Sequence, residues 1–372
     1  MSTFQYTHPY FNPQRFPNVR NCLTPSLQVN SDWRPGLVRF PPKISNGKLL
    51  LARLEGTVDA YDLNNAVQLW QFKLPNPLSS LYPDGFVLVD HESLITRVGD
   101  QLFVLDINSG DPLVVKQSPY FDLPSAVFQG ADLIAFDVTP EMKRFCVAWN
   151  VAEGNISWEF PVDYPAHFIT AVDDLVVFAS GKSQAACLSV TNGRVNWTVD
   201  VDVLFSDKPH ESPLQIEGAI LSFENLFILG VRPYYIVALE KSTGKVSWIQ
   251  KLKTEHVVAT CGYPDAAIFV LDSRYCYELS ANDGTIRREI FIDKQRKEKG
   301  FSLFTLPTAT DRFLYFSDVH TGTLIAMSLE TGEFCWEYLC DAKIPIFNAP
   351  VIVGNQLFIV DTKGRFYGFL EP

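Results

Sequence analysis

The sequence predicts an all-β protein, an eight-bladed β-propeller whose blades are four-stranded antiparallel sheets. Three observations predict it: a phrase that recurs seven times, a spacing of 39 to 51 residues between successive copies, and a last unit that is one strand short. A repeat of this length is typical of propeller blades. The 13 % of aromatic residues, together with 21 Gly and 24 Pro, favour many short strands joined by tight turns.

Each copy of the phrase consists of an apolar strand, a turn that ends in Gly, and a Trp four residues after that Gly. The Gly supplies the positive φ of a tight hairpin, and the Thr, Asn or Ser before it offers an oxygen to the turn backbone. Because Trp has a large apolar plane and one N–H, we expect it to dock on the neighbouring blade. The copies lie at 60–70, 104–114, 148–158, 187–197, 238–248, 278–288 and 326–336. The docking tryptophans are Trp70, Trp158, Trp197, Trp248 and Trp336.

Three positions depart from the phrase. Ala66 replaces the turn Gly of the first copy, and Val114 and Arg288 stand where Trp is expected in the second and sixth copies. We therefore expect weaker docking contacts from blades two and six.

The last unit predicts how the ring closes. Residues 349–353, 356–360 and 365–369 supply three strands, after which the sequence ends. The segment Cys22–Val29 is of suitable length to be the fourth strand, and its pairing would remove an exposed sheet edge. We thus expect an amino-terminal arm at 1–34 that includes the ring-closing strand, and one propeller domain at 35–372. Seven blades plus a partial blade is the alternative.

The phrase A-x-D/N-x-x-T-G-x-x-x-W resembles the tryptophan-docking repeat of the pyrroloquinoline-quinone-like (PQQ-like) β-propeller family, from about Pro35 to Phe369. That family includes quinoprotein alcohol dehydrogenases and an outer-membrane assembly lipoprotein. For the dehydrogenases, the resemblance implies an adjacent Cys-Cys pair over the cofactor, calcium ligands and an Asp base. No two of the seven cysteines are adjacent, so we predict no quinone cofactor.

The composition restricts the kind of binding partner and the cellular compartment that we expect for this protein. The formal charge of -11 and the pI near 5.1 argue against an extended nucleic-acid surface. There is no run of 18 apolar residues, and the first residues are polar where a signal peptide is apolar. Seven scattered cysteines fit a reducing compartment. We expect a cytoplasmic protein that binds neither membrane nor nucleic acid and is monomeric by itself.

Motifs for catalysis or metal binding do not emerge. The sequence has no GxSxG elbow, no GxGxxG or GxxxxGK[ST] loop and no CxxC pair, and its six histidines are dispersed. We predict no catalytic residue, no metal site and no cofactor, and we favour a protein that is not an enzyme.

Binding is expected on the propeller face where the second-to-third-strand hairpins and the connections between blades gather. Aromatic and basic residues of these loops are typical interface anchors, and the alternative is that the aromatics fill gaps at the rim of the core. The candidate partner-binding residues are Tyr82, Tyr120, Tyr164, His167, His210, Arg232, Tyr234, Tyr235, Arg296, Lys297 and Phe347.

The favoured hypothesis is a non-catalytic protein-interaction scaffold that binds a basic partner. An inhibitor or immunity-type protein that masks a basic toxin or enzyme is a specific version, because opposite charge speeds association. Two other functions stay open. One is a hydrolase or lyase with its site at the mouth of the central channel, and the other is a sensor of a small ligand or sugar at the same mouth.

Overall fold

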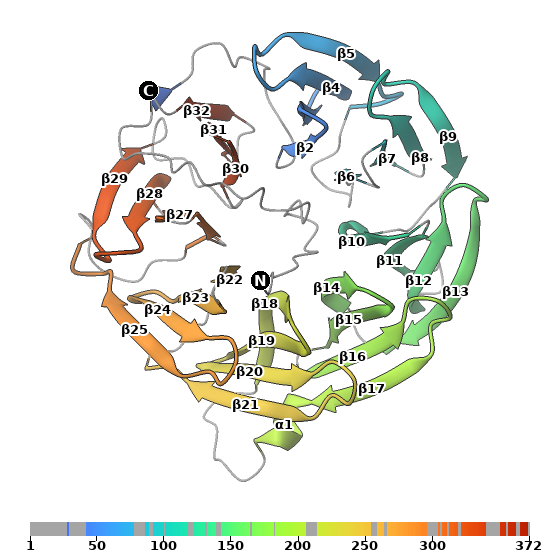
Figure 1. Cartoon of the computed structure of the whole chain (residues 1–372). Coiled ribbons are helices and arrows are strands. Elements are labelled where there is room, and N and C mark those ends of the chain that lie inside the picture. The colour runs from blue at the N-terminus through green and yellow to red at the C-terminus, as the bar shows by residue number, and fades with distance from the viewer. Residues whose placement is uncertain are drawn as a thin grey trace.

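The computed structural model forms a ring of eight four-stranded antiparallel sheets, as predicted (Figure 1). In Figure 1 the first strand of each blade lies toward the centre and the last strand forms the outer rim. The structure describes residues 28–29, 42–77, 86–88, 92–99, 101–117, 122–130, 132–138, 143–163, 166–181, 183–205, 214–253, 259–263, 266–295, 304–305, 307–310, 312–318, 321–339, 350–354, 356–361 and 365–370.

Blades 1 to 4 follow one another along the chain. Their strands are β2 (Lys43–Ser45), β3 (Lys48–Arg53), β4 (Thr57–Asp62) and β5 (Gln68–Lys73); β6 (Phe86–Leu88), β7 (Ser93–Val98), β8 (Gln101–Asp106) and β9 (Pro112–Gln117); β10 (Asp122–Gln129), β11 (Asp132–Val138), β12 (Arg144–Asn150) and β13 (Asn155–Val162); and β14 (Ala166–Val172), β15 (Leu175–Ser180), β16 (Gln184–Ser189) and β17 (Val195–Asp200).

Blades 5 to 8 continue in the same order, and blade 8 ends with a strand from the start of the chain. Their strands are β18 (Gln215–Phe223), β19 (Leu226–Arg232), β20 (Tyr235–Glu240) and β21 (Val246–Lys251); β22 (Ala259–Tyr263), β23 (Ala267–Leu271), β24 (Tyr275–Ser280) and β25 (Ile286–Phe291); β26 (Thr308–Ala309), β27 (Phe313–Asp318), β28 (Thr323–Ser328) and β29 (Phe334–Leu339); and β30 (Val351–Val353), β31 (Gln356–Val360), β32 (Phe366–Leu370) and β1 (Gln28–Val29).

Burial follows the position of a strand in its blade. The second and third strands are packed between two neighbouring blades, so every residue of β23 is buried. The outer strands have apolar neighbours mainly on one side, so exposed and half-buried residues alternate along most of β5. The core is thus a set of apolar layers between blades, and the outer strands form the wall of the molecule.

The ring closes as predicted. Val29 of β1 pairs with Phe369, and Gln28 pairs with Leu370, in antiparallel register. This strand completes blade 8, so the eight-bladed prediction is confirmed. Residues 22–27 of the predicted closing segment lie outside the described residues.

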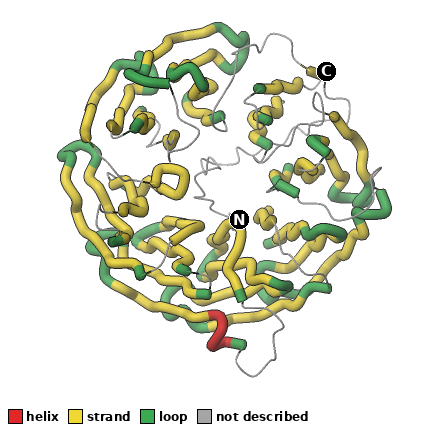
Figure 2. Tube along the Cα trace, turned by 180° about the vertical axis from the view of Figure 1, so that it is seen from behind, coloured by secondary structure: helices red, strands yellow, loops and turns green. Residues whose placement is uncertain are grey.

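A short helix, α1 (Val201–Leu204), follows the outer strand of blade 4 and was not predicted. The side chain of Asp200 caps it by accepting a hydrogen bond from the N–H of Asp202. In Figure 2, which shows the molecule from behind, this helix lies outside the ring of strands.

Four of the five predicted docking tryptophans contact the turn of the next blade. The Trp70 Nε1–H donates to the carbonyl of Ile107, three residues before the turn glycine Gly110, at 2.8 Å. A Cβ at Gly110 would lie 2.6 Å from the Trp70 ring, so the glycine leaves room for the indole. The same bond recurs at three further interfaces between neighbouring blades, which we call seams. It runs from Trp158 to Val190, from Trp197 to Lys241 and from Trp248 to Ala281.

Where the tryptophan is missing, other side chains contact the turn. Arg288 Nη1 donates to the carbonyl of Glu330 at 2.9 Å, so the seam after blade 6 keeps a hydrogen bond that the sequence did not predict. From blade 8, Gln356 Nε2 donates to the carbonyl of Leu63 at 2.8 Å, the position that accepts an indole N–H in other blades. Val114 packs against the apolar cluster of blades 2 and 3 without such a donor group.

Trp336 differs because the ring closes at its seam. Blade 8 pairs β32 with β1 from the other end of the chain, so its third and fourth strands are not joined by a turn of the kind that receives the other tryptophans. The Trp336 ring instead contacts Phe369 edge-on at 5.4 Å and lies parallel to Tyr338 at 6.0 Å. Aromatic packing therefore replaces the hydrogen bond at this seam.

Candidate functional site

One hairpin of blade 5 brings three of the predicted partner-binding residues together. Arg232, Tyr234 and Tyr235 connect β19 to β20. The Phe205 ring, just after α1, packs on Tyr235 at 4.4 Å, and the N–H of Leu252 donates to the carbonyl of Tyr234 at 2.7 Å. The hairpin thus lies beside both the connection that enters blade 5 and the one that leaves it, which is the gathering of loops that the topology predicts.

The three side chains differ in how much surface they offer. Tyr235 is only 3 % exposed, and burial, followed by the neighbouring Tyr234, raises its pKa. Arg232 and Tyr234 are half-buried. Arg232 Nη1 lies 2.6 Å from Glu217 Oε1, and the Lys251 ammonium lies 4.6 Å above the Tyr234 ring. Tyr235 therefore fills a gap in the core, whereas Arg232 and Tyr234 reach the surface on a braced hairpin.

The structure does not describe the side chains of the other predicted partner-binding residues. His167 belongs to β14, but its side chain lies outside the described part of the chain. The remaining candidates fall in connections that the structure does not describe, namely Tyr82, Tyr120, Tyr164, His210, Arg296, Lys297 and Phe347.

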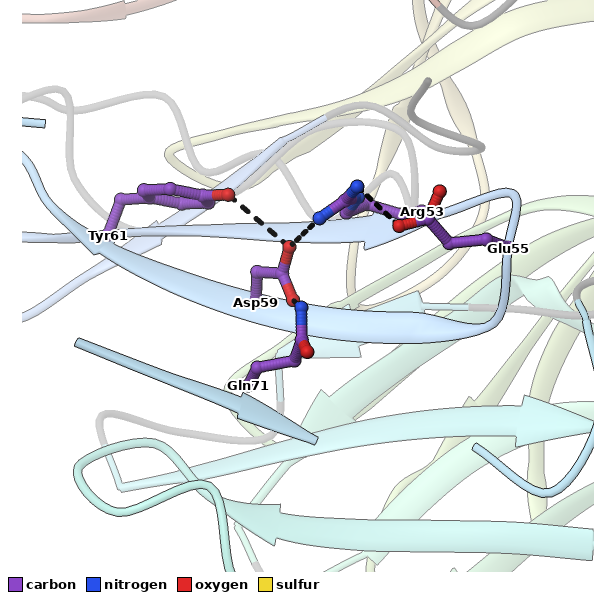
Figure 3. A network of polar contacts seen from close by, with 5 residues as sticks. All are labelled: Arg53, Glu55, Asp59, Tyr61 and Gln71. Atoms are coloured by element: carbon purple, nitrogen blue, oxygen red, sulfur yellow. Dashed lines mark hydrogen bonds and ion pairs between the residues drawn. The ribbon is translucent and has the colours of Figure 1, made fainter. Parts of the chain in front are cut away.

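The equivalent hairpin of blade 1 carries a polar network that the sequence analysis missed (Figure 3). The Asp59 carboxylate is fully buried and accepts hydrogen bonds from Arg53 Nη1 at 3.0 Å, Gln71 Nε2 at 2.9 Å and the Tyr61 hydroxyl at 3.3 Å. Arg53 also forms an ion pair with the exposed Glu55. Because both carboxylate oxygens are satisfied, the network clamps the hairpin between β3 and β4.

The chemistry of this network is structural. Burial and the charge of Asp59 raise the pKa of Tyr61 to about 12, so its hydroxyl stays protonated and keeps donating above pH 10, where an ordinary tyrosine ionises. Blade 8 repeats the arrangement, with Arg365 Nε 3.5 Å and the Tyr367 hydroxyl 3.2 Å from a buried Asp361 oxygen. A sequence signal existed, because Asp59 interrupts a buried strand where an apolar residue is the rule.

Replacing Tyr61 by Phe is expected to change the response of stability to high pH. Unfolded tyrosine loses its proton near pH 10, whereas folded Tyr61 keeps it to about pH 12. In that window the unfolded state binds fewer protons, so the free energy of unfolding of the wild type falls as pH rises. In the Tyr61→Phe protein the free energy of unfolding should fall less steeply between pH 10 and pH 12. At neutral pH its free energy of unfolding should be about 1 kcal/mol lower than that of the wild type, because one hydrogen bond is missing. Urea denaturation below and within the window measures both, and parallel pH profiles of the two proteins would contradict the assignment.

The described residues contain neither a metal-binding cluster nor a membrane-spanning helix. No group of three or more His, Cys, Asp or Glu side chains among them is arranged to hold a metal ion. The one helix that they contain is too short to cross a membrane.

A model of a known family matches the chain. It is described as outer membrane protein assembly factor BamB, and it matches residues 126–338 and again 235–370, together more than half of the sequence. The chain belongs to this BamB family. As a BamB-family propeller it carries the PQQ-like repeat, so the resemblance found in the docking phrase is confirmed.

Solved structures share the fold of this BamB-family protein. BamB from Moraxella catarrhalis has 13 % identity and a TM-score of 0.66, over 92 % of this chain and 99 % of that one. The C-terminal WD40 domain of Sif2 has 12 % identity and a TM-score of 0.66, over 94 % and 99 %. A europium-containing methanol dehydrogenase has 11 % identity and a TM-score of 0.63, over 95 % and 86 %. No curated protein sequence matches the chain. At these identities the likeness shows the fold alone, because propellers carry unrelated functions.

Proposed function

We propose that this BamB-family propeller is a non-catalytic protein-interaction scaffold that binds a basic partner protein. It would do so through its loop-bearing face, the face with the second-to-third-strand hairpins and the connections between blades. In its specific form it is an inhibitor or immunity-type protein that masks a basic toxin or enzyme. The proposal places it in the cytoplasm as a monomer, in line with the free thiols of Cys146 and Cys187 and of the exposed Cys335.

The observation that carries the proposal is the braced hairpin of blade 5. Arg232 and Tyr234 reach the surface there, while Glu217, Lys251 and the buried Tyr235 hold them in place. Fixed Arg and Tyr side chains lose little conformational entropy on binding and are enriched among the residues that dominate interfaces. The formal charge of -11 favours a basic partner, and the family description, an assembly factor, favours action through protein contacts.

The test is co-purification of the tagged protein from its native host, with mass spectrometry of what elutes. We expect one stoichiometric basic protein whose binding weakens as salt rises. Tyr234→Ser should weaken that binding about tenfold or more, whereas Tyr234→Phe should retain most of it because the ring remains. Tyr235 is left unchanged because its loss would open a cavity in the core.

Val195→Ser is the control, since this exposed residue lies at the other end of its blade, beside the turn at Gly193. A protein that elutes without a partner, or a partner that binds the Tyr234→Ser protein as tightly as the wild type, would overturn the proposed function.

A further inference from the structure

The chain contains two Asn-Gly pairs, and both lie in turns between neighbouring strands of one blade. Asn46 and Gly47 connect β2 to β3 in blade 1, and Asn192 and Gly193 lie in the turn between β16 and β17 of blade 4. An Asn-Gly pair is chemically labile, because glycine has no Cβ to shield its main-chain nitrogen from the side chain of the preceding asparagine. The two turns differ in how firmly the structure holds them.

The turn at Asn46 is open to solvent. Asn46 and Gly47 are both exposed, and no atom lies within 4 Å of the place of a Cβ on Gly47. Their φ angles of +49° and +69° are those of a tight hairpin turn between the paired residues Ser45 and Lys48. Within the described part of the chain, no hydrogen bond holds the Gly47 N–H. This turn can therefore open locally without breaking a contact of the Gly47 nitrogen.

The turn at Asn192 is held by its own hydrogen bonds and by the neighbouring blade. The Gly193 N–H donates to the carbonyl of Ser189 at 2.9 Å, and Asn192 Oδ1 accepts from the N–H of Arg194 at 3.0 Å. Gly193 is buried, and the place of its Cβ lies 2.7 Å from the Trp158 ring of blade 3. Movement of this nitrogen toward the asparagine side chain therefore requires the seam between blades 3 and 4 to open.

We propose that Asn46 is a site of spontaneous deamidation and that the fold protects Asn192 from the same reaction. The Gly47 main-chain nitrogen gives its proton to hydroxide and attacks Asn46 Cγ. The bond between Cγ and the side-chain nitrogen breaks, and ammonia leaves with a proton taken from water, so hydroxide is regenerated.

Water then opens the succinimide ring that joins Asn46 to Gly47. Addition of water at Cγ gives aspartate and restores the main chain. Addition at the main-chain carbonyl of residue 46 gives isoaspartate, in which the main chain runs through the former side chain. Both products carry a new negative charge, and isoaspartate also lengthens the main chain by a methylene group.

The altered turn lies beside the seam where the ring closes. The Gly47 carbonyl accepts the N–H of Leu63 at 2.9 Å, and the carbonyl of Leu63 accepts Gln356 Nε2 of blade 8 at 2.8 Å. A longer main chain no longer fits the tight turn between Ser45 and Lys48, and Ser45 is buried. We therefore expect isoaspartate formation to loosen blade 1 at its contact with blade 8.

Peptide mapping of the wild-type protein tests the site directly. Trypsin releases Asn46 in the peptide 44–48 and Asn192 in the peptide 183–194. The folded protein is kept in mildly alkaline buffer, and samples taken over time are digested and analysed by mass spectrometry. Asn46 should convert at least about tenfold faster than Asn192, with isoaspartate among its products. In concentrated urea the two rates should become similar, because neither turn is then folded.

Gly47→Ala is the control variant, because its Cβ meets no neighbouring atom but hinders attack by the nitrogen. It should slow the conversion of Asn46 and leave that of Asn192 unchanged. The aged wild type should melt at a lower temperature than the fresh protein, whereas aged Gly47→Ala should melt as it does when fresh.

Equal conversion of the two asparagines in the folded protein, or no conversion of Asn46, would overturn the inference. An aged wild type that contains isoaspartate and melts like the fresh protein would overturn the expected effect on the seam. The outcome is independent of the proposed function, since Tyr234→Ser should leave both conversion rates unchanged.

Discussion

Replacing Gly244 by Ala is expected to lower the free energy of unfolding by about 3 kcal/mol. Gly244 has φ +69°, which costs an L-residue about 1 kcal/mol, and a new Cβ would lie 2.6 Å from the Trp197 ring. Because Trp197 is held by its bond to the carbonyl of Lys241, the ring cannot withdraw without losing that bond. Urea denaturation measures the loss.

Gly47 is the matched control for this variant. It has the same φ of +69°, but no atom lies within 4 Å of the place of its Cβ. Gly47→Ala should therefore show the backbone cost alone, about 1 kcal/mol. Equal losses in the two variants would show that the indole does not require the glycine. Ala66 supports the same reasoning, because it has φ +58° at the first turn, where Gln356 rather than a tryptophan contacts the turn.

Deletion of residues 1–30 is expected to lower the melting temperature by at least about 5 °C. The deletion removes β1, so β32 loses the pairing of Leu370 with Gln28 and of Phe369 with Val29. It also leaves an open edge on blade 8, and the two ends of the ring are then no longer joined by a shared sheet. Thermal unfolding followed by circular dichroism measures the shift.

A shorter deletion, of residues 1–21, provides the comparison because it retains the whole predicted closing segment, Cys22–Val29. It should melt close to the wild type. If the two truncated proteins melted together, or if the longer deletion left the melting temperature unchanged, ring closure by β1 would not contribute to stability.

Most of the fold was predictable because it repeats. A single spacing of glycine and tryptophan marks seven of the eight blades, and the seven copies reinforce one another even where Ala66, Val114 or Arg288 departs from the phrase. The replacements at those positions were not predictable. Gln356 is nearly three hundred residues from Leu63 in the sequence, and Arg288 reaches Glu330 from another blade, so only the closed ring shows these bonds.

The candidate site was predictable in part. The composition of the hairpin predicts Arg232 and Tyr234 as interface residues, and both side chains are half-buried and reach the surface. Tyr235 has the same chemistry as its neighbour, and no local pattern indicates that Phe205 covers it. The buried network of Asp59 was missed because its partners Arg53 and Gln71 lie on different strands.

By itself the sequence determined the repeat, predicted a ring of eight blades over the alternative of seven plus a partial blade, and identified the four tryptophans that dock on the turn of the next blade. It could do so because turn glycines, strand alternation and tryptophan spacing are local properties that lie within one repeat. Only the tertiary structure decided which side chains replace a missing tryptophan, which aromatic residues stay exposed and which of the two Asn-Gly turns a neighbouring blade protects. Those features depend on contacts between blades, and such contacts join residues that lie far apart in the chain.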